Sequence, residues 1–91
     1  MTLKIYKYIL DGGGIHSLSI SGFQKILSIK KQYERAVLYV IVDAESSAVT
    51  NLLIRSFWTG QGMFDMGGFD YLDSILFENG DYVVHYFVKV V

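Results

Sequence analysis

The stretch AVLYVIV, residues 36–42, is the longest uninterrupted apolar run in the chain. Its β-branched and aromatic residues favour an extended backbone. Apolar side chains occupy both alternating sets of positions, which is typical of a strand that other parts of the protein cover on each side. We therefore predict a central β-strand here, ended by Asp43.

Outward from this run, the chain divides into further short runs rich in β-branched and aromatic residues, separated by turn residues. The clearest turn signal is Asn79-Gly80, a pair that favours the two-residue type I′ turn of a β-hairpin. No segment repeats apolar residues at helical spacing for more than about two turns. The pattern predicts an all-β fold: a single small antiparallel barrel or sandwich of about seven strands, forming one domain over residues 1–91. The expected strands cover residues 3–10, 15–20, 23–30, 36–42, 51–58, 71–77 and 82–91.

Composition and charge exclude several classes of protein. Of the 91 residues, 52% are hydrophobic, which excludes a disordered chain. Eight basic against nine acidic residues give a formal net charge of −1, so no strong electrostatic field favours nucleic acid or an anionic membrane as a partner. No apolar run reaches the roughly 18–20 residues that cross a bilayer, and we expect no export signal. The absence of cysteine excludes disulfides and is compatible with a reducing cytoplasm.

The sequence contains no motif typical of catalysis or of cofactor binding. The glycines at 12–14 lack the following Lys and Ser or Thr of a phosphate loop, and the GQG motif at 60–62 has Asp65 where a dinucleotide fingerprint needs its third glycine. Asp65, Asp70 and Asp73 do not have the spacing of a calcium loop. No serine lies in a nucleophile elbow. We therefore expect no catalytic residue, no metal site and no cofactor, and a protein that is not an enzyme.

His16 and His85 are the two imidazoles of the chain, each within a strand of apolar neighbours. We expect both to be partly buried structural residues, hydrogen-bonded to neighbouring groups. His85 has an alternative role at the mouth of a barrel. There, a neutral imidazole would donate and accept hydrogen bonds with the base or carbonyl of a ligand.

A binding site is expected where the fifth strand ends. Trp58 offers an indole that stacks on a flat ring, and Arg55 offers a guanidinium that binds a carboxylate or phosphate through two hydrogen bonds. Residues three apart lie on opposite faces of a regular strand, so as a binding pair Arg55 and Trp58 would act together across the strand end. The alternative is that Trp58 packs in the core and Arg55 forms a surface ion pair. The candidate ligand-binding residues are Arg55, Trp58, Thr59, Gly60, Gln61 and His85.

The segment that follows, residues 59–68, combines four glycines with Met63, Phe64 and Met66. Loops are normally polar, so these apolar side chains are unusual. They either fold back as a lid on the core or remain exposed for a partner.

Five short motifs together carry a family resemblance. They are KIYKY (4–8), QKILSI (24–29), LYVIVDAE (38–45), WTGQ (58–61) and VVHYF (83–87). In this order they resemble an uncharacterised family of small proteins encoded by bacteriophages and prophages. The resemblance implies a phage context and a compact β fold, and it implies no activity. Trp58 and Gln61 stand where the turn of that family has a glycine and a histidine, so a function that needs the histidine does not transfer.

Two functional hypotheses from different classes follow. The first is a phage accessory protein that binds without catalysis in the host cytoplasm, countering host defence by sequestering a nucleotide-type small molecule or by blocking a host protein. The second is a structural or assembly protein that pairs its exposed strand edges with itself or with a virion component. A small apolar-rich chain leaves apolar surface for a partner, so a homo-oligomer is expected.

Overall fold

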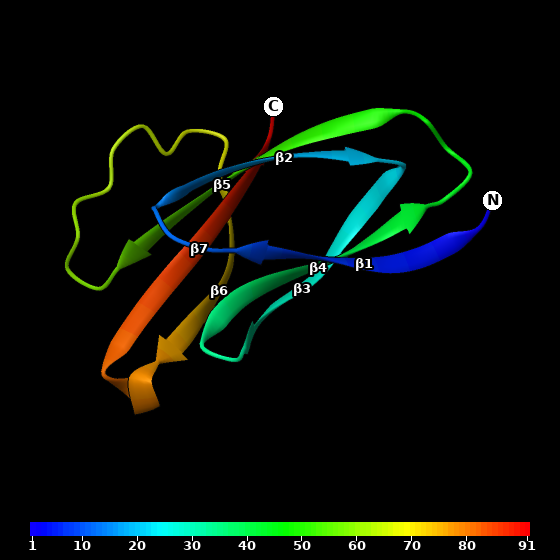
Figure 1. Ribbon diagram of the computed structural model, residues 1–91. Coiled ribbons are helices and arrows are strands. Elements are labelled where there is room, and N and C mark those ends of the chain that lie inside the picture. The colour runs from blue at the N-terminus through cyan, green and yellow to red at the C-terminus, as the bar shows by residue number, and fades with distance from the viewer.

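Seven β-strands and one short 3-10 turn form the structure, a computed structural model that describes residues 1–91. The strands make two antiparallel sheets in two layers, a three-stranded sheet in the order β1–β4–β3 and a four-stranded sheet in the order β2–β5–β7–β6 (Figure 1). The all-β prediction is confirmed. Of the two predicted architectures, barrel and sandwich, the protein adopts the sandwich, because the sheets do not join into a closed barrel. The elements are β1 (Leu3–Leu10), β2 (Ile15–Ser21), β3 (Phe23–Gln32), β4 (Arg35–Asp43), β5 (Val49–Trp58), β6 (Asp70–Phe77), η1 (Glu78–Gly80) and β7 (Tyr82–Val90).

Strand β4 is the centre of the three-stranded sheet, as its apolar sequence predicts. Its inward side chains are completely buried: Leu38 and Val40 are 0% exposed, and Val42 is 1% exposed. These residues belong to the same core cluster as Leu52 and Ile54 of β5. Complete burial of an aliphatic side chain stabilises a fold by about 1.5–3 kcal/mol. This layer of contacts therefore holds the two sheets together.

The outer face of β4 is covered only in part: Val37 on this face is 2% exposed, so the prediction of burial on both sides holds at this end of the strand alone. Tyr39 and Ile41 on this face are only half-buried. On the neighbouring strand β1, Ile5 and Ile9 are 60% and 47% exposed. The apolar character that predicted burial on both sides of β4 therefore lies partly at the surface of the protein.

The chain passes from one sheet to the other at Gly22, which joins β2 to β3. The Gly22 N–H donates a hydrogen bond to the carbonyl oxygen of Ala48 at 2.7 Å, and its own carbonyl oxygen accepts one from the N–H of Asp43 at 2.7 Å. Its φ of +70° is a left-handed conformation that residues with a side chain rarely adopt. A Cβ atom would lie 2.1 Å from the carbonyl oxygen of Asp43. Only glycine fits this corner.

The hairpin between β6 and β7 contains the turn that the sequence predicts. Asn79 and Gly80 have φ values of 59° and 93°, and the N–H of Asp81 donates to the carbonyl oxygen of Glu78 at 3.2 Å. Positive φ at both central residues is the signature of a type I′ turn. Strand pairing stops one residue earlier on each side, so the connecting loop is longer than the two residues expected.

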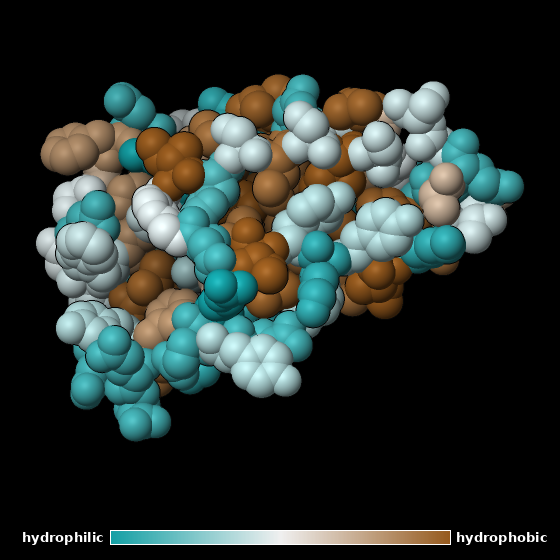
Figure 2. All heavy atoms as spheres, viewed as in Figure 1, coloured by the Kyte–Doolittle hydropathy of each residue, from teal (hydrophilic) through white to brown (hydrophobic).

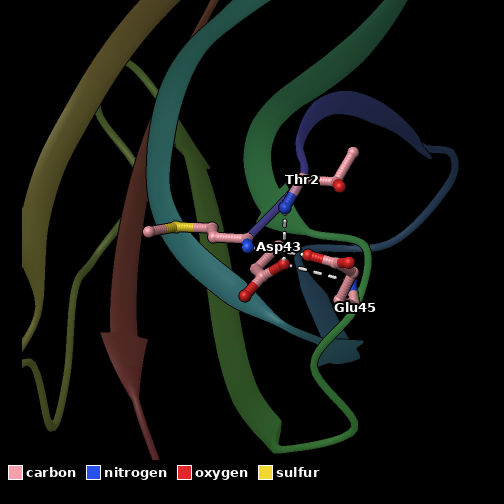
Figure 3. Close-up of polar contacts among 4 residues, drawn as sticks. Thr2, Asp43 and Glu45 are labelled. Carbon is pink, nitrogen blue, oxygen red and sulfur yellow. Dashed lines mark hydrogen bonds and ion pairs between the residues drawn. The ribbon is translucent and has the colours of Figure 1, made fainter.

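Asp43, at the end of β4, holds the N-terminal segment in place (Figure 3). Its Oδ1 atom accepts a hydrogen bond from the N–H of Glu45 at 3.0 Å and another from the N–H of Thr2 at 3.1 Å. The same two hydrogen bonds, aided by the nearby terminal ammonium group, lower the pKa of the Asp43 carboxyl. Met1 itself forms an ion pair with Glu45 at 2.7 Å.

Several large apolar side chains remain at the surface of this small sandwich. In the view of Figure 2, brown hydrophobic atoms reach the surface across the middle and the upper edge of the molecule, and hydrophilic side chains gather at the right end and the lower left. Trp58, Phe64 and Ile15 are 64%, 74% and 66% exposed, respectively. The exposed apolar side chains are spread over both sheets, so their function depends on which face each one occupies.

Replacing Gly22 with alanine should lower the free energy of unfolding by about 2 kcal/mol or more, because left-handed backbone alone costs a residue about 1–2 kcal/mol and the new Cβ atom meets a backbone oxygen. Urea unfolding measures this change. Gly12→Ala is the matched control, with a positive φ and no atom within 4 Å of the added Cβ. An equal loss in both variants would contradict the steric role of the corner.

The Asp43 carboxylate should make stability depend on pH. Because its pKa is lower in the folded protein than in the unfolded chain, its contribution is present at neutral pH and is lost as the pH falls below about 4, through the folded-state pKa. An Asp43→Asn variant keeps an oxygen acceptor but does not titrate. Its unfolding midpoint should therefore fall less than that of the wild type between pH 5 and pH 2, roughly the window in which an aspartate protonates. Parallel acid profiles would contradict this assignment.

Candidate binding cavity between the two sheets

A cavity of about 760 Å³ opens between the sheets at the end where β1 and β5 finish. Its apolar wall includes Leu10 and Ala36 from the three-stranded sheet and Val84 from the four-stranded sheet, and the glycine loop 12–14 borders it. Pockets that bind small molecules commonly measure about 300–1,000 Å³ and have mostly apolar walls. The size and lining of the cavity therefore suit a small-molecule ligand.

Three polar side chains from the inner face of the four-stranded sheet point into this cavity: His16 of β2, Ser56 of β5 and Tyr86 of β7. Ser56 and Tyr86 are directly opposite each other in the pairing of β5 with β7. The alternation of side chains along β5 explains the placement, because Ser56 shares a face with the buried core residues Leu52 and Ile54. Local strand geometry thus brings a hydroxyl, a phenol and an imidazole together.

The hydroxyl of Tyr86 is available to a ligand. The residue is only 5% exposed, yet its oxygen has no hydrogen-bond partner within the protein. No completely buried side-chain oxygen or nitrogen lacks a partner, so this oxygen must be open to the cavity. Burial raises the pKa of the Tyr86 phenol, which is therefore neutral and able both to donate and to accept a hydrogen bond.

Two exposed aromatic side chains stand at the mouth of the cavity. Trp58 is 64% exposed and Tyr82 is 57% exposed, and both line the opening. Trp58 pairs with Val84, so Tyr82 occupies the diagonal position on the same face. Diagonal neighbours on paired strands are about 7–8 Å apart. This spacing leaves room for one planar ring between two aromatic side chains.

The rim of the cavity is acidic. Asp11, Glu34 and Glu78 contribute carboxylates, whereas Arg35 is the only basic residue among the lining side chains. The Nε atom of Arg35 lies 3.4 Å from the Asp11 carboxylate. The backbone N–H of Glu78 donates to Glu34, and together with Lys31 this contact lowers the pKa of Glu34, which stays ionised. Lys31 also forms an ion pair with Glu34 at 3.2 Å, so Glu78 is the rim carboxylate without a cationic partner and gives the opening a net negative charge.

Trp58 and Gln61 are the two residues of the sequence-predicted site that line this cavity. The side-chain oxygen of Gln61 accepts a hydrogen bond from the Trp58 N–H at 3.1 Å, and the Gln61 N–H donates to the Trp58 carbonyl oxygen at 3.0 Å. Gly60, with φ +91°, occupies the left-handed position of this turn. The turn fixes where β5 ends and therefore where the indole stands.

Arg55 lies on the opposite face of β5, away from the cavity. Its Nη1 atom donates to the carbonyl oxygens of Phe64 at 2.7 Å and Asp65 at 3.1 Å. The guanidinium also lies over the rings of Phe57 and Phe69, 5.0 and 5.5 Å from their centroids. These contacts fold the loop between β5 and β6 back over the outer face of the sheet. The structure thus separates Arg55 from Trp58 instead of joining them in one site.

His85 and Thr59 also lie on this outer face. The Nε2 atom of His85 is 2.9 Å from the Thr59 hydroxyl, and its Nδ1 atom is 2.5 Å from the hydroxyl of Ser74, which in turn contacts the Tyr71 hydroxyl at 2.7 Å. This chain of hydrogen bonds joins the start of the loop to β7 and β6. Ser74 and His85 line neither of the two cavities of the protein.

Two further features bear on the kind of site present. No group of three or more histidine, cysteine, aspartate or glutamate side chains is arranged to hold a metal ion. The structure contains no helix of the length and apolarity needed to span a bilayer.

Sequence reasoning missed His16 as a cavity residue and did not single out Ser56, Tyr82 or Tyr86 as a group. One signal was present in the sequence: Ser56 and Trp58 share a face with the apolar residues at positions 52 and 54. That parity alone would have placed a hydroxyl beside the indole. The contributions of β2 and β7 depend on strand register, which the local pattern does not contain.

Comparison with known proteins gives a family and no function. No curated protein and no solved structure matches the chain. The whole chain, residues 1–91, matches the family DUF7352, which is described as a domain of unknown function. The protein therefore belongs to the DUF7352 family.

Proposed function

We propose that this protein is a non-enzymatic binding protein that holds a small planar ring compound in the cavity between its two sheets. One observation carries the proposal: the hydroxyl of the buried residue Tyr86 has no partner in the protein and is open to a cavity whose mouth is flanked by Trp58 and Tyr82. A hydroxyl placed this way can form a hydrogen bond to a molecule in the cavity. A ligand that supplies this partner and stacks on the indole satisfies both features.

The chemistry of the lining indicates a ring of the nucleobase type. His16, Ser56 and Tyr86 provide both donors and acceptors, which match the edge of a base, and aromatic faces bind any base by stacking. The base of the nucleotide-type ligand expected from the sequence matches this lining. Its phosphates match the rim poorly, because carboxylates outnumber cations among the lining side chains. We therefore propose a nucleobase or nucleoside as the ligand class.

The biological role follows from sequence resemblance and is part of the proposal. The likeness of five motifs to phage-encoded proteins supports action in the cytoplasm of an infected host. Removing a base-containing molecule from solution there would counter a host defence that depends on it. Binding by a cavity without a catalytic group is sufficient for such sequestration, because the ligand need only be withheld.

The alternative function, assembly through strand edges, has one open edge in its favour, because the edge strand β2 carries no Lys, Arg, Asp or Glu and pairs with β5 without a register shift. The other three edges are protected. The pairing of β3 and of β6 with their neighbours is interrupted by register shifts, and the β1 edge carries Lys4 and Lys7. Bulges and lysines on edge strands oppose pairing with another chain. The cavity offers the more specific hypothesis.

Binding should be visible through Trp58, the single tryptophan of the chain. Titration with adenosine, guanosine, cytidine or uridine should quench its fluorescence for at least one nucleoside. In calorimetry, Trp58→Ala should weaken binding of that nucleoside at least about 10-fold, because stacking on an aromatic ring is worth roughly 1–3 kcal/mol. His16→Ala should weaken it as well through loss of a hydrogen-bonding group.

The matched control is Phe64→Ala, which removes an exposed aromatic ring from the loop that folds over the outer face. It should bind the nucleoside like the wild type. Urea unfolding of each variant separates loss of binding from loss of fold. The proposal fails if no nucleoside binds, or if folded Trp58→Ala binds unchanged.

The acidic rim should discriminate against phosphate. The 5′-monophosphate of the bound nucleoside should bind more weakly than the nucleoside itself. Glu78→Lys should reduce the ratio of the nucleoside affinity to the monophosphate affinity by about 3- to 10-fold, because reversing one exposed charge changes its interaction with a nearby phosphate by about 1 kcal/mol. Asp70→Lys, an exposed position on β6 outside the cavity lining, is the charge-matched control. An equal reduction in both variants would assign the effect to net charge and contradict the role of the rim.

A further inference from the structure

Strand β2 is an edge of the four-stranded sheet, and its open side has no strand beside it. It pairs with β5 alone, over its whole length and without a register shift. Its sequence, IHSLSIS, contains neither a charged residue nor a proline. Charges, prolines and bulges are the features that keep edge strands from pairing with another chain. The β2 edge is therefore open to one more strand.

The register of β2 on β5 shows which backbone groups lie on this open side. At the two ends of β2, the Ser56 N–H donates to the Gly14 carbonyl oxygen at 2.9 Å, and the Gly22 N–H donates to the Ala48 carbonyl oxygen at 2.7 Å. Both contacts continue the β2–β5 register. Hydrogen-bonded and non-hydrogen-bonded positions alternate along an antiparallel pair, so the even-numbered residues of β2 are bonded to β5.

The odd-numbered residues of β2 direct their backbone groups away from β5. These residues are Ile15, Ser17, Ser19 and Ser21. Each of them presents one N–H donor and one C=O acceptor on the open side of the sheet. Their side chains are all exposed, on the outer face of the sheet. The edge therefore offers a regular row of alternating donors and acceptors.

The other sheet edges limit how far such pairing can extend. The pairing of β3 and of β6 with their neighbours contains register shifts, and β1 carries Lys4 and Lys7. These features oppose contact with a further strand. A molecule with one open edge can make one contact of this kind, so pairing of this chain with itself ends at a closed two-fold dimer.

The chemistry of β2 selects a second copy as the occupant of its edge. When two β2 strands run antiparallel about an axis at Leu18, Ser17 of one copy is opposite Ser19 of the other, and Ile15 is opposite Ser21. Every free N–H of one strand then meets a free C=O of the other. No like charges meet, because the strand has none. Leu18, half-buried against the core, lies next to its own counterpart.

A bilayer does not suit this edge, because lipid tails supply no partner for the free backbone groups. We propose that two copies of this protein pair through β2, antiparallel about a two-fold axis at Leu18, and join their four-stranded sheets into one continuous sheet. The dimer is closed, which distinguishes it from open-ended assembly through strand edges. The inference does not rest on the cavity or on its ligand.

Two double variants test both the surface and the register. Ser17→Lys with Ser19→Lys places lysines opposite each other at two points of the dimer, and the dissociation constant should rise at least about 10-fold. Ser17→Glu with Ser19→Lys places glutamate opposite lysine at the same two points, so this variant should dimerise at least as tightly as the wild type. Sedimentation equilibrium measures the dissociation constants.

The two variants are matched controls for each other. Both lose the hydrogen bond from the Ser19 hydroxyl to the Asn51 side chain, 2.6 Å long in the wild type, and both replace the same two residues. Urea unfolding shows whether each one is folded.

Hydrogen exchange of the wild type gives a readout that needs no variant. The amide protons of Ser17 and Ser19 should exchange at least about 10-fold more slowly at concentrations that favour the dimer than in the dilute monomer. The amide protons of His16 and Leu18, which are bonded to β5, should show no such dependence on concentration.

Four results would overturn the proposal. The wild type sediments as a monomer or as an open series of larger species. The wild-type dimer forms without added protection of the Ser17 and Ser19 amides. The folded variant with two lysines dimerises as tightly as the wild type, which places the interface elsewhere. The folded variant with glutamate and lysine dissociates as readily as the one with two lysines, which contradicts the register about Leu18.

Discussion

Burial of the inner face of β4 against β5 is the constraint on which the other features of this protein depend. Once Leu38 and Val40 point into the core, the alternation of side chains sends Tyr39 and Ile41 to the outer face of the sheet. On β5, burial of Ile54 places Trp58 on the cavity side and sends Arg55 outward. The cavity and the partly covered outer face of β4 are therefore two results of one packing arrangement.

The sequence was sufficient to predict the seven strands, the type I′ turn and the all-β class, because each rests on local alternation and turn chemistry. It was not sufficient to predict which residues share a site. Arg55 and Trp58 are close along the chain but lie on opposite faces, and the carbonyl oxygens that bind Arg55 come from a loop with no regular pattern. His16 and Tyr86 meet in the cavity only through the pairing of β2, β5 and β7, which is a property of strand register.

Net charge also concealed an important feature. A formal charge of −1 indicates no preference for charged partners, yet the structure segregates the charges. The carboxylates of Asp11, Glu34 and Glu78 gather at the mouth of the cavity, whereas Lys7, Lys25 and Lys30 gather on the outer face of the three-stranded sheet. Local potential, set by strand register, governs which ligand approaches each surface. The net charge of the whole chain carries no information about the potential at either surface.

The corner at Gly22 has a consequence for how the molecule folds. Because β2 and β3 follow each other in sequence but enter different sheets, β2 finds its neighbour only in β5, and β1 finds its neighbour only in β4. Non-local pairings of this kind require long loops to close, and the entropy of the chain is lost before the strands form stabilising contacts. Folding is therefore slow for a chain of this size. On the ribosome, the N-terminal strands emerge before their partners have been synthesised. The nascent chain therefore exposes apolar strands until most of the sequence is available, and exposed apolar strands of this kind are prone to aggregation during that interval.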